Sequence, residues 1–348
     1  MSSILQESGD GAVHKNVAPR DLLGRPLHDL RLSVIEACNF RCPYCMPADR
    51  IPDDHGMGSA ARMSFDEIET LVAGFVRNGV SKLRLTGGEP LLRKGLAGLV
   101  ARLTRIDGLD DIALTTNGSL LASQARALRD AGLGRITVSL DALDPVRFRA
   151  LSGNRGEVVD VLRGIDAAGA AGFEAIKLNC VVQRGVNDDE VLPLVAFARD
   201  HGHVVRFIEY MDVGTCNGWR REFVVPSAEL LDRIHARWPL HPLGAQYRGE
   251  VAARHGFDDG VGEVGFVSSV SAPFCGDCHR ARVSADGRLY TCLFAGEGSD
   301  LRPMLAAGEA TLAAHIAQLW SRRGDRYSEI RSDAVAGRKK VEMFLVGG

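Results

Sequence analysis

Six of the eight cysteines in this 348-residue chain fall into two groups of three. The first group lies in the run ACNFRCPYCMP, where Cys38, Cys42 and Cys45 have the spacing CxxxCxxC. Three thiolates on such a short loop can hold three corners of a cubane iron–sulfur cluster and leave one iron open to another ligand. A structural zinc ion is the alternative, and it would need a fourth ligand from elsewhere in the chain.

The second group lies in CGDCHRARVSADGRLYTC, residues 275–292, and consists of Cys275, Cys278 and Cys292. No fourth cysteine follows it in the sequence. One interpretation adds His279 as the fourth ligand of a Cys3His zinc site, although adjacent residues seldom both reach one metal. The other interpretation is a second cubane with its own open iron.

Two arginines follow the second CxxC pair at alternate positions, Arg280 and Arg282. On an extended segment their side chains point to the same face. Two guanidinium groups on one face can bind a carboxylate or a phosphate bidentately. A solvated basic turn is the alternative interpretation of this pair.

Composition and charge are those of a soluble globular protein, with 45% hydrophobic and 25% charged residues. The net charge of −2 argues against general binding to nucleic acid or to an anionic membrane. No apolar run approaches the roughly 20 residues of a membrane span. Residues 1–20 have no apolar signal-peptide core, so we expect a flexible leader and a cytoplasmic protein. Disulfides are rare in that compartment, and we interpret the two isolated cysteines, Cys180 and Cys216, as free non-ligand residues.

A strand–helix alternation from about residue 30 to residue 235 must position these groups. Apolar, β-branched runs predict six strands, at residues 30–35, 82–87, 112–118, 135–141, 175–182 and 204–211. The first intervening helix begins with a capping box at Ser64 and Glu67. Four glycines are placed to end helices: Gly79, Gly132, Gly172 and Gly202. Six β-α units in series imply a parallel sheet, either doubly wound or curled into a barrel.

One face of these predicted strands is polar, and this distinguishes the two folds. Strands covered on both sides should be apolar almost throughout. The polar positions here alternate instead: Arg31, Ser33, Arg84, Thr86, Thr115, Asn117, Thr137, Ser139, Asp141, Lys177, Asn179 and Arg206. Some of these side chains could snorkel or pair within the sheet, but six such strands predict a lumen that binds a ligand, and four cations predict an anionic ligand. We therefore expect an α/β fold with a partial (β/α)6 barrel of the TIM type over residues 21–240.

After about residue 240 the strand–helix alternation stops. The sequence there is richer in short β runs, with a hairpin turn at Asp286-Gly287 and a last helix near ATLAAHIAQLW, residues 310–320. We expect a smaller C-terminal domain over residues 241–348 that carries the second cysteine group.

The first cysteine group and a later motif together resemble the radical S-adenosylmethionine (SAM) enzymes. CxxxCxxC follows the first predicted strand, Tyr44 precedes the third cysteine, and the second strand runs into TGGEP, residues 86–90. The resemblance implies a 4Fe–4S cluster whose open iron binds SAM, with TGGEP near the methionine end of SAM. It also implies reductive cleavage of SAM to methionine and a 5′-deoxyadenosyl radical, which abstracts a hydrogen atom from the substrate.

Over about residues 21–348 the chain resembles a narrower family, the GTP 3′,8-cyclases of molybdenum cofactor biosynthesis. The motifs that carry the resemblance are DLLGRPLHDLRLSVIEACNFRCPYCMP, LRLTGGEPLLR, LTTNG, VSLDALD, KLNCVVQRGVNDDE, RFIEYMDVG, FCGDCHRARVSADGRLYTCLF and the terminal Gly347-Gly348. It implies a radical SAM lyase with two 4Fe–4S clusters that converts GTP to (8S)-3′,8-cyclo-7,8-dihydroguanosine 5′-triphosphate. It further implies that the Gly-Gly tail reaches the active site; a loose tail without function is the alternative.

The same resemblance implies a role for each site residue. The SAM cluster would be held by Cys38, Cys42 and Cys45, and a second cluster, whose open iron binds guanine, by Cys275, Cys278 and Cys292. The implied SAM contacts are Tyr44, Gly88, Ser139 and Met211. The implied GTP contacts are Arg31, Arg84, Thr115, Lys177, Arg280 and Arg282, and the last two count as catalytic with the SAM-cluster cysteines. On this interpretation His279 binds no metal, and Arg206 is a lumen charge without an assigned role.

The implied partners are GTP as substrate, a cyclic pyranopterin monophosphate synthase as the downstream enzyme, and an electron donor such as flavodoxin or ferredoxin. We also expect a homodimer, and neither nucleic acid nor a membrane as a partner. Two other classes remain as alternatives. One is a radical SAM maturase that acts on a peptide and usually has more C-terminal cysteines; the other is a non-catalytic zinc or electron-transfer protein.

Overall fold

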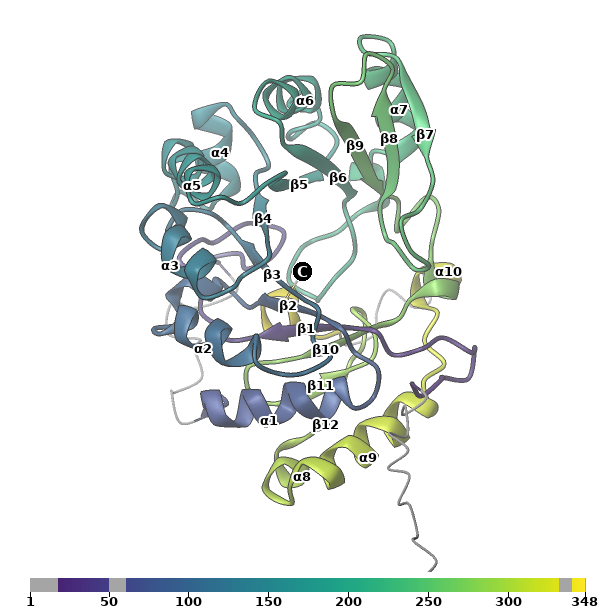
Figure 1. Ribbon diagram of the computed structural model, residues 1–348. Coiled ribbons are helices and arrows are strands. Elements are labelled where there is room, and N and C mark those ends of the chain that lie inside the picture. Colours follow the sequence, from purple (N-terminus) through teal and green to yellow (C-terminus); the bar gives the residue numbers. More distant parts are fainter. Residues whose placement is uncertain (1–17, 50–60, 332–339, 348) are drawn as a thin grey trace, which may run out of the picture.

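Twelve strands form one continuous sheet in the computed structural model, which describes residues 18–49, 61–331 and 340–347 (Figure 1). Its order is β12-β11-β10-β1-β2-β3-β4-β5-β6-β9-β8-β7. The six central strands are parallel neighbours in chain order: β1 (Asp29–Ser33), β2 (Lys82–Thr86), β3 (Asp111–Thr116), β4 (Arg135–Ser139), β5 (Lys177–Val182) and β6 (Val204–Glu209). The six strands predicted from the sequence are thus confirmed, each to within two residues at either end.

Helices connect these strands and pack on the outer face of the sheet (Figure 1). They are α1 (Phe65–Val76), α2 (Leu96–Leu103), α3 (Ala125–Asp130), α4 (Pro145–Leu151), α5 (Val158–Ala170), α6 (Val191–Asp200) and α7 (Ser227–His235). The capping box of α1 is confirmed: Ser64 Oγ accepts from the Glu67 amide at 3.1 Å, and Glu67 Oε2 accepts from the Ser64 amide at 2.7 Å. The four glycines predicted to end helices all have left-handed backbone, with φ between +67° and +95°.

The chain after residue 240 extends both edges of this sheet. It forms β7 (Leu240–Leu243), β8 (Ala253–Phe257), β9 (Glu263–Val267), β10 (Arg280–Val283), β11 (Arg288–Tyr290) and β12 (Ser299–Asp300). β9 pairs in parallel with β6, and β10 pairs in parallel with β1 on the opposite side. β7 and β12 stand at the two ends of the order, so within the described residues the sheet is not closed. The predicted domain boundary near residue 240 stays a prediction.

Four further helices follow: α8 (Arg302–Ala306), α9 (Glu309–Ser321), α10 (Tyr327–Ile330) and α11 (Met343–Val346). The predicted hairpin turn at Asp286-Gly287 joins β10 to the antiparallel β11, and α9 is the predicted last long helix. α9 packs against α1 and buries Trp320, which is 1% exposed. Among the helices described, none is long and apolar enough to cross a membrane.

The two faces of the central sheet differ in polarity, as the alternation predicts. On β5 the side chains of Leu178, Cys180 and Val182 are fully buried in the core beneath the helices. The intervening residues Lys177 and Asn179 line a cavity on the inner face. The core therefore lies between sheet and helices, and the inner face is free to line a site.

Candidate functional site

A cavity of about 360 Å³ lies on the inner face of the sheet, within the size range of small-molecule sites. Every residue to which the sequence gave a binding or catalytic role contributes to its lining. The lining contains Arg31, Cys38, Cys42, Tyr44, Cys45, Arg84, Gly88, Thr115, Ser139, Lys177, Met211, Cys275, Cys278, Arg280, Arg282 and Cys292. The structure thus brings together side chains from opposite ends of the sequence around one space.

The two cysteine groups lie at opposite ends of that cavity. Cys38, Cys42 and Cys45 follow the carboxyl end of β1, whereas Cys278 lies two residues before Arg280, at the amino end of β10. Because β1 and β10 pair in parallel, these are opposite ends of adjacent strands. Cys292 follows the antiparallel β11 and therefore returns to the end of Cys278. The length of β1 alone separates the two ends by about 13 Å.

The TGGEP loop packs against the first cysteine group through backbone contacts. The Gly88 amide donates to the Ile35 carbonyl at 2.8 Å, and the Glu89 amide donates to the Ala37 carbonyl at 2.8 Å. A Cβ at Gly87 would overlap the Ile35 oxygen, and one at Gly88 the Ala37 oxygen. The glycine pair is therefore required for the loop after β2 to reach the loop that carries Cys38.

Glu89 is held in this loop as a fully buried carboxyl group. It accepts from Thr116 Oγ1 at 2.7 Å, from the Asn117 amide at 2.7 Å and from the Leu91 amide at 3.0 Å. Burial outweighs these donors and raises its pKa to about 7. A cation placed beside Glu89 would restore its charge at neutral pH.

The first three thiols lie in a buried environment that resists ionisation without a metal. Burial raises the pKa of Cys38 to about 11, and it raises the pKa of Cys42 and Cys45 further. Metal binding displaces such protons, because the thiolate is the ligand. Tyr44 next to Cys45 is fixed by its hydroxyl, which donates to Asp141 Oδ2 at 2.6 Å.

In the second group Cys278 has a different environment. Arg280 Nη2 donates to its sulfur at 3.3 Å, and Arg323 Nη2 donates to the same sulfur at 3.2 Å. Burial alone would raise the pKa of this thiol, but the two guanidinium groups outweigh it and lower the pKa to about 6. Burial raises the pKa of Cys292, which receives no such bond, to about 12. Cys278 is thus already stabilised as a thiolate.

In neither cysteine group do all three sulfurs lie within 4.8 Å of one another. Zn–S bonds of about 2.3 Å in a tetrahedron place sulfurs about 3.8 Å apart. In the described residues the one group of three or more possible ligands with all ligand atoms within 4.8 Å of one another is His28, Asp29 and His279. A cubane cluster separates its thiolate ligands further than a single ion does, because several metal atoms lie between them. His279 lies instead beside Asp29, with Nδ1 3.6 Å from Oδ2.

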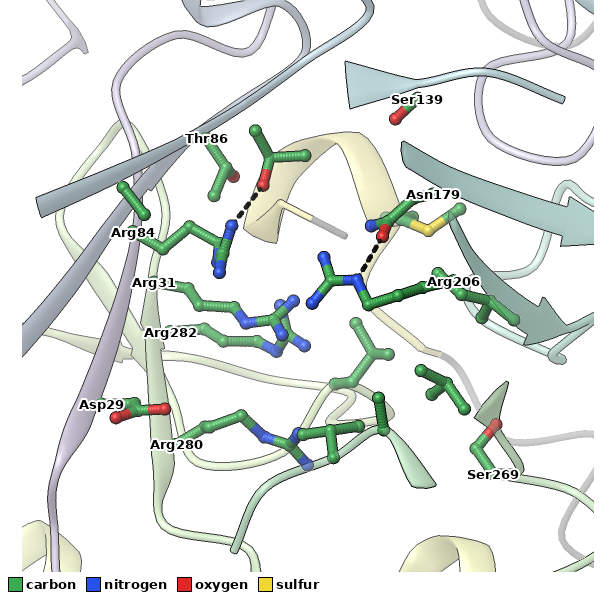
Figure 2. Close-up of a pocket in the computed structure, with 18 of the residues that line it drawn as sticks. Asp29, Arg31, Arg84, Thr86, Ser139, Asn179, Arg206, Ser269, Arg280 and Arg282 are labelled. Atoms are coloured by element: carbon green, nitrogen blue, oxygen red, sulfur yellow. Dashed lines mark hydrogen bonds between the residues drawn. The ribbon is translucent and has the colours of Figure 1, made fainter. Parts of the chain in front are cut away.

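Cations dominate the walls between the two cysteine groups. Figure 2 shows the guanidinium groups of five arginines directed into the same space. With Lys177 they are Arg31, Arg84, Arg206, Arg280 and Arg282, and none of the six forms an ion pair with a carboxylate of the described residues. Arg282, Arg31 and Arg84 occupy one row of the sheet, because Arg31 is in register with both others. An anion in this space would relieve an uncompensated positive charge.

Burial and mutual repulsion act on these groups in the same direction. Burial, and then neighbouring arginines, lower the pKa of Arg31 and Arg206. Burial, and then Arg206, Arg135 and Arg84, lower the pKa of Lys177 to about 8. Lys177 is therefore the cavity cation whose charge changes most easily near neutral pH, since guanidinium groups remain protonated there.

Neutral hydrogen-bond partners hold two of the arginines in place. Arg84 Nη1 donates to Thr115 Oγ1 and to Thr137 Oγ1, each at 3.1 Å. Arg206 Nε donates to Asn179 Oδ1 at 2.9 Å (Figure 2). These acceptors orient the guanidinium groups without neutralising them. Thr115, which the resemblance made a ligand contact, is in the structure also a support for Arg84.

The C-terminal segment closes part of the cavity wall. Met343 and Phe344 of α11 line the cavity, and Arg282 Nη1 donates to the carbonyl of Gly347. Gly347 has φ +66°, and a Cβ there would overlap the side chain of Thr86. The first glycine of the tail thus lies at the site, whereas Gly348 is outside the described residues.

Sequence reasoning missed several lining residues. Lys82 lies on β2 two residues before Arg84, and its Nζ is 3.4 Å from the ring centre of Tyr247. The alternation of side chains along the strand places Lys82 on the same face as Arg84, so the sequence pattern could have identified it. Arg206, in contrast, was predicted as a lumen charge, and it does line the cavity. No local pattern distinguishes Tyr247 or Arg323, because both reach the site from segments outside the six β-α units.

Two family models match the chain. The Radical SAM superfamily matches residues 32–198, and Molybdenum Cofactor Synthesis C matches residues 203–329. The GTP 3′,8-cyclase of Xanthomonas campestris pv. campestris (strain B100) is 68% identical over 329 residues, which cover 94% of this chain and 97% of that protein. The GTP 3′,8-cyclase of Acidothermus cellulolyticus is 51% identical over 357 residues, with 94% and 99% covered.

Among solved structures, Streptococcus suis SuiB bound to S-adenosylmethionine aligns with a TM-score of 0.58 at 15% identity. The alignment covers 90% of this chain and 72% of SuiB. At this identity the likeness concerns the fold alone, and it supports a mixed α/β fold with a radical SAM domain.

Proposed function

The chain belongs to the GTP 3′,8-cyclase family of molybdenum cofactor biosynthesis, and we propose that it cyclises GTP by radical SAM chemistry in the basic cavity. One observation carries the proposal. Two cysteine groups lie at opposite ends of a cavity whose intervening walls present six cations, none of them paired with a carboxylate in the part of the chain that the structure describes. This arrangement suits an anionic substrate held between two iron–sulfur clusters.

The first cysteine group would hold a 4Fe–4S cluster together with SAM, and the second a 4Fe–4S cluster that meets the guanine base. The sulfur spacing supports clusters over single zinc ions at both places. The first cluster would supply the electron for SAM cleavage, and the second would contact the base. His279 is directed to Asp29, which supports its exclusion from the ligands.

SAM would lie at the carboxyl ends of the strands, against Tyr44, Gly88, Ser139 and Met211, which all line that part of the cavity. The buried carboxyl of Glu89 lies in the same loop as Gly88, and an ammonium group is the kind of cation that would restore its charge. Strand ends are the usual place of active sites in β-α barrels.

GTP would lie between the two ends, with its triphosphate against the row of Arg282, Arg31 and Arg84 and against Lys177. Arg280, which also donates to Cys278, would join the nucleotide end to the second cysteine group. Thr115 would act both as a contact and as an orienting acceptor for Arg84. These side chains would position the ribose with its 3′ hydrogen toward SAM, and closure of the carbon bond to C8 of guanine would then depend on that positioning.

The C-terminal segment would help to exclude water from this reaction. Phe344 and Val346 are buried, and Arg282 donates to Gly347. We extend this role to the Gly-Gly tail as a whole, as the family resemblance implies.

The fold that carries the site is proposed to be a partial (β/α)6 barrel over residues 21–240, with a C-terminal domain over residues 241–348 and a leader at residues 1–20.

The proposal includes the downstream enzyme, the electron donor, the compartment and the oligomeric state that we expect from the sequence. A cyclic pyranopterin monophosphate synthase would consume the product, a flavodoxin or ferredoxin would supply electrons, and the enzyme would act as a cytoplasmic homodimer.

An anaerobic incubation tests the function. With SAM and dithionite, the enzyme should release 5′-deoxyadenosine and consume GTP together. Release of 5′-deoxyadenosine that neither depends on GTP nor consumes it would refute GTP as the substrate.

A further inference from the structure

A buried charge triad lies directly behind the second cysteine group. Arg25 Nε is 2.6 Å from Asp21 Oδ2, and Arg323 Nη1 is 3.1 Å from the same oxygen. The three residues are 7% (Asp21), 1% (Arg25) and 4% (Arg323) exposed. Asp21 thus faces two guanidinium groups away from water, and a second carboxylate, Asp325, lies with Oδ2 3.5 Å from Arg323 Nε.

Both arginines use their other donors on the segments that carry the cysteines. Arg25 Nη1 donates to the carbonyl of Cys275 at 2.6 Å, and Arg323 Nη1 donates to the carbonyl of Cys278 at 2.6 Å. Arg323 Nε donates to the carbonyl of Thr291, next to Cys292, at 3.0 Å. The triad therefore contacts the backbone at or beside all three cysteines.

Arg323 also reaches the metal-binding atom itself. Its Nη2 donates to Cys278 Sγ at 3.2 Å, and the ring of Trp320 lies 4.5 Å from its guanidinium carbon. Four of its five N–H donors are thus engaged, by Asp21, by two carbonyls and by a sulfur. A side chain that only fastened the N-terminal segment to α9 would need the bond to Asp21 alone.

Besides its two carboxylate partners, Arg323 hydrogen-bonds to the segments that carry the cysteines, through the Thr291 and Cys278 carbonyls and Cys278 Sγ. Three thiolates bound to a cubane make a site of net negative charge, and one-electron reduction makes it more negative. Hydrogen bonds to cluster sulfurs and nearby cations stabilise the reduced state more than the oxidised one.

We infer that Arg323, held in place by Asp21 and Arg25, is a positioning residue of the second cluster that sets the geometry of its cysteine loop and raises its reduction potential. This inference rests on the proposed function, because it requires that a second cluster forms. Arg280, which is proposed to contact the nucleotide, binds the same sulfur from the cavity. Cys278 Sγ therefore accepts from two arginines with different proposed roles, Arg280 for the nucleotide and Arg323 for the cluster.

The test is a redox titration of the full-length holoenzyme followed by electron paramagnetic resonance. The signal of the second cluster is identified as the one that Cys292→Ser removes. In Arg323→Met this signal should shift to a more negative midpoint potential, while the first-cluster signal stays at its wild-type potential. Arg322→Met is the matched control, since the neighbouring arginine is exposed, and both signals should stay unchanged.

Arg323→Lys keeps the charge but cannot reach two carbonyls, a carboxylate and a sulfur together, so it should fold and still shift the second signal in the negative direction. An unchanged potential in both Arg323 variants would overturn the inference. If Arg323→Met fails to load its second cluster, the potential of the lysine variant decides in the same way. A wild-type protein with about four irons and no second signal would instead refute the second cluster, and hence the proposed function.

Discussion

Lys177 provides a quantitative test of the cationic cavity. Its pKa lies near 8, because burial and the charges of Arg206, Arg135 and Arg84 disfavour its protonated form. The protonated amine attracts a triphosphate, so binding should be strongest below pH 8 and should weaken as the pH rises through that value. The terminal phosphate of a nucleotide, whose second pKa is about 6, is already ionised above pH 7.5 and does not reverse this sign.

The magnitude follows from the protonated fraction. With a pKa of about 8, roughly three quarters of Lys177 is charged at pH 7.5 and roughly one tenth at pH 9. If bound GTP keeps the amine protonated, the dissociation constant should rise about eightfold between these two pH values. The measurement is anaerobic equilibrium dialysis of GTP against holoenzyme at constant ionic strength, because screening also weakens binding.

Two variants isolate the contribution of this residue. Lys177→Arg keeps a permanent charge, so its GTP affinity should be nearly independent of pH over this range. Lys177→Met should bind GTP weakly at both pH values and likewise show little change. A wild-type affinity that is the same at pH 7.5 and pH 9, or an arginine variant with the full eightfold change, would refute the reasoning.

Three further predictions concern other parts of the site. Cys292→Ser should retain about four of about eight irons per chain by colorimetric assay, together with some uncoupled SAM cleavage and no cyclised product; full activity would contradict the second-cluster assignment. Arg280→Ala and Arg282→Ala should each weaken GTP binding roughly 10- to 150-fold, since a charge-assisted bond contributes about 1.5–3 kcal/mol; unchanged affinity in dialysis would remove their role. Gly87→Ala should lower the melting temperature and the iron content, because its Cβ would overlap the Ile35 oxygen. The control Gly98→Ala in α2, which has open space around it, should be neutral or stabilising by about 0.5–1 kcal/mol. Equal behaviour of the two variants would argue against the tight loop contact.

Local patterns predicted the six central strands and the cations on their inner face. Strand alternation has a period of two, so a polar face on Arg31, Arg84 and Lys177 could be recognised before any contact was known. The same rule marks Lys82, which lies on that face and was overlooked. Residues within one β-α unit are therefore accessible to sequence reasoning, because each unit repeats the same geometry.

Contacts between distant segments could not be predicted in this way. The pairing of β10 with β1 joins residues about 250 positions apart, and nothing in either strand specifies its neighbour. Arg323 resembles an ordinary basic residue after a helix, and its role depends on Asp21, which lies 302 positions earlier in the chain. The resemblance implies that TGGEP lies near SAM, and the close backbone contact of its glycines with the cysteine loop could be recognised only in the structure.

The central claim is that the cavity presents the ribose of GTP to the radical generated from SAM. GTP deuterated at the 3′ carbon tests it most directly, with the mass of the released 5′-deoxyadenosine as the readout. The account predicts that the 5′-deoxyadenosine gains a single deuterium and that a 3′,8-cyclised product forms in parallel. Unlabelled 5′-deoxyadenosine in the presence of deuterated GTP, or label acquired from another carbon of the ribose, would contradict it.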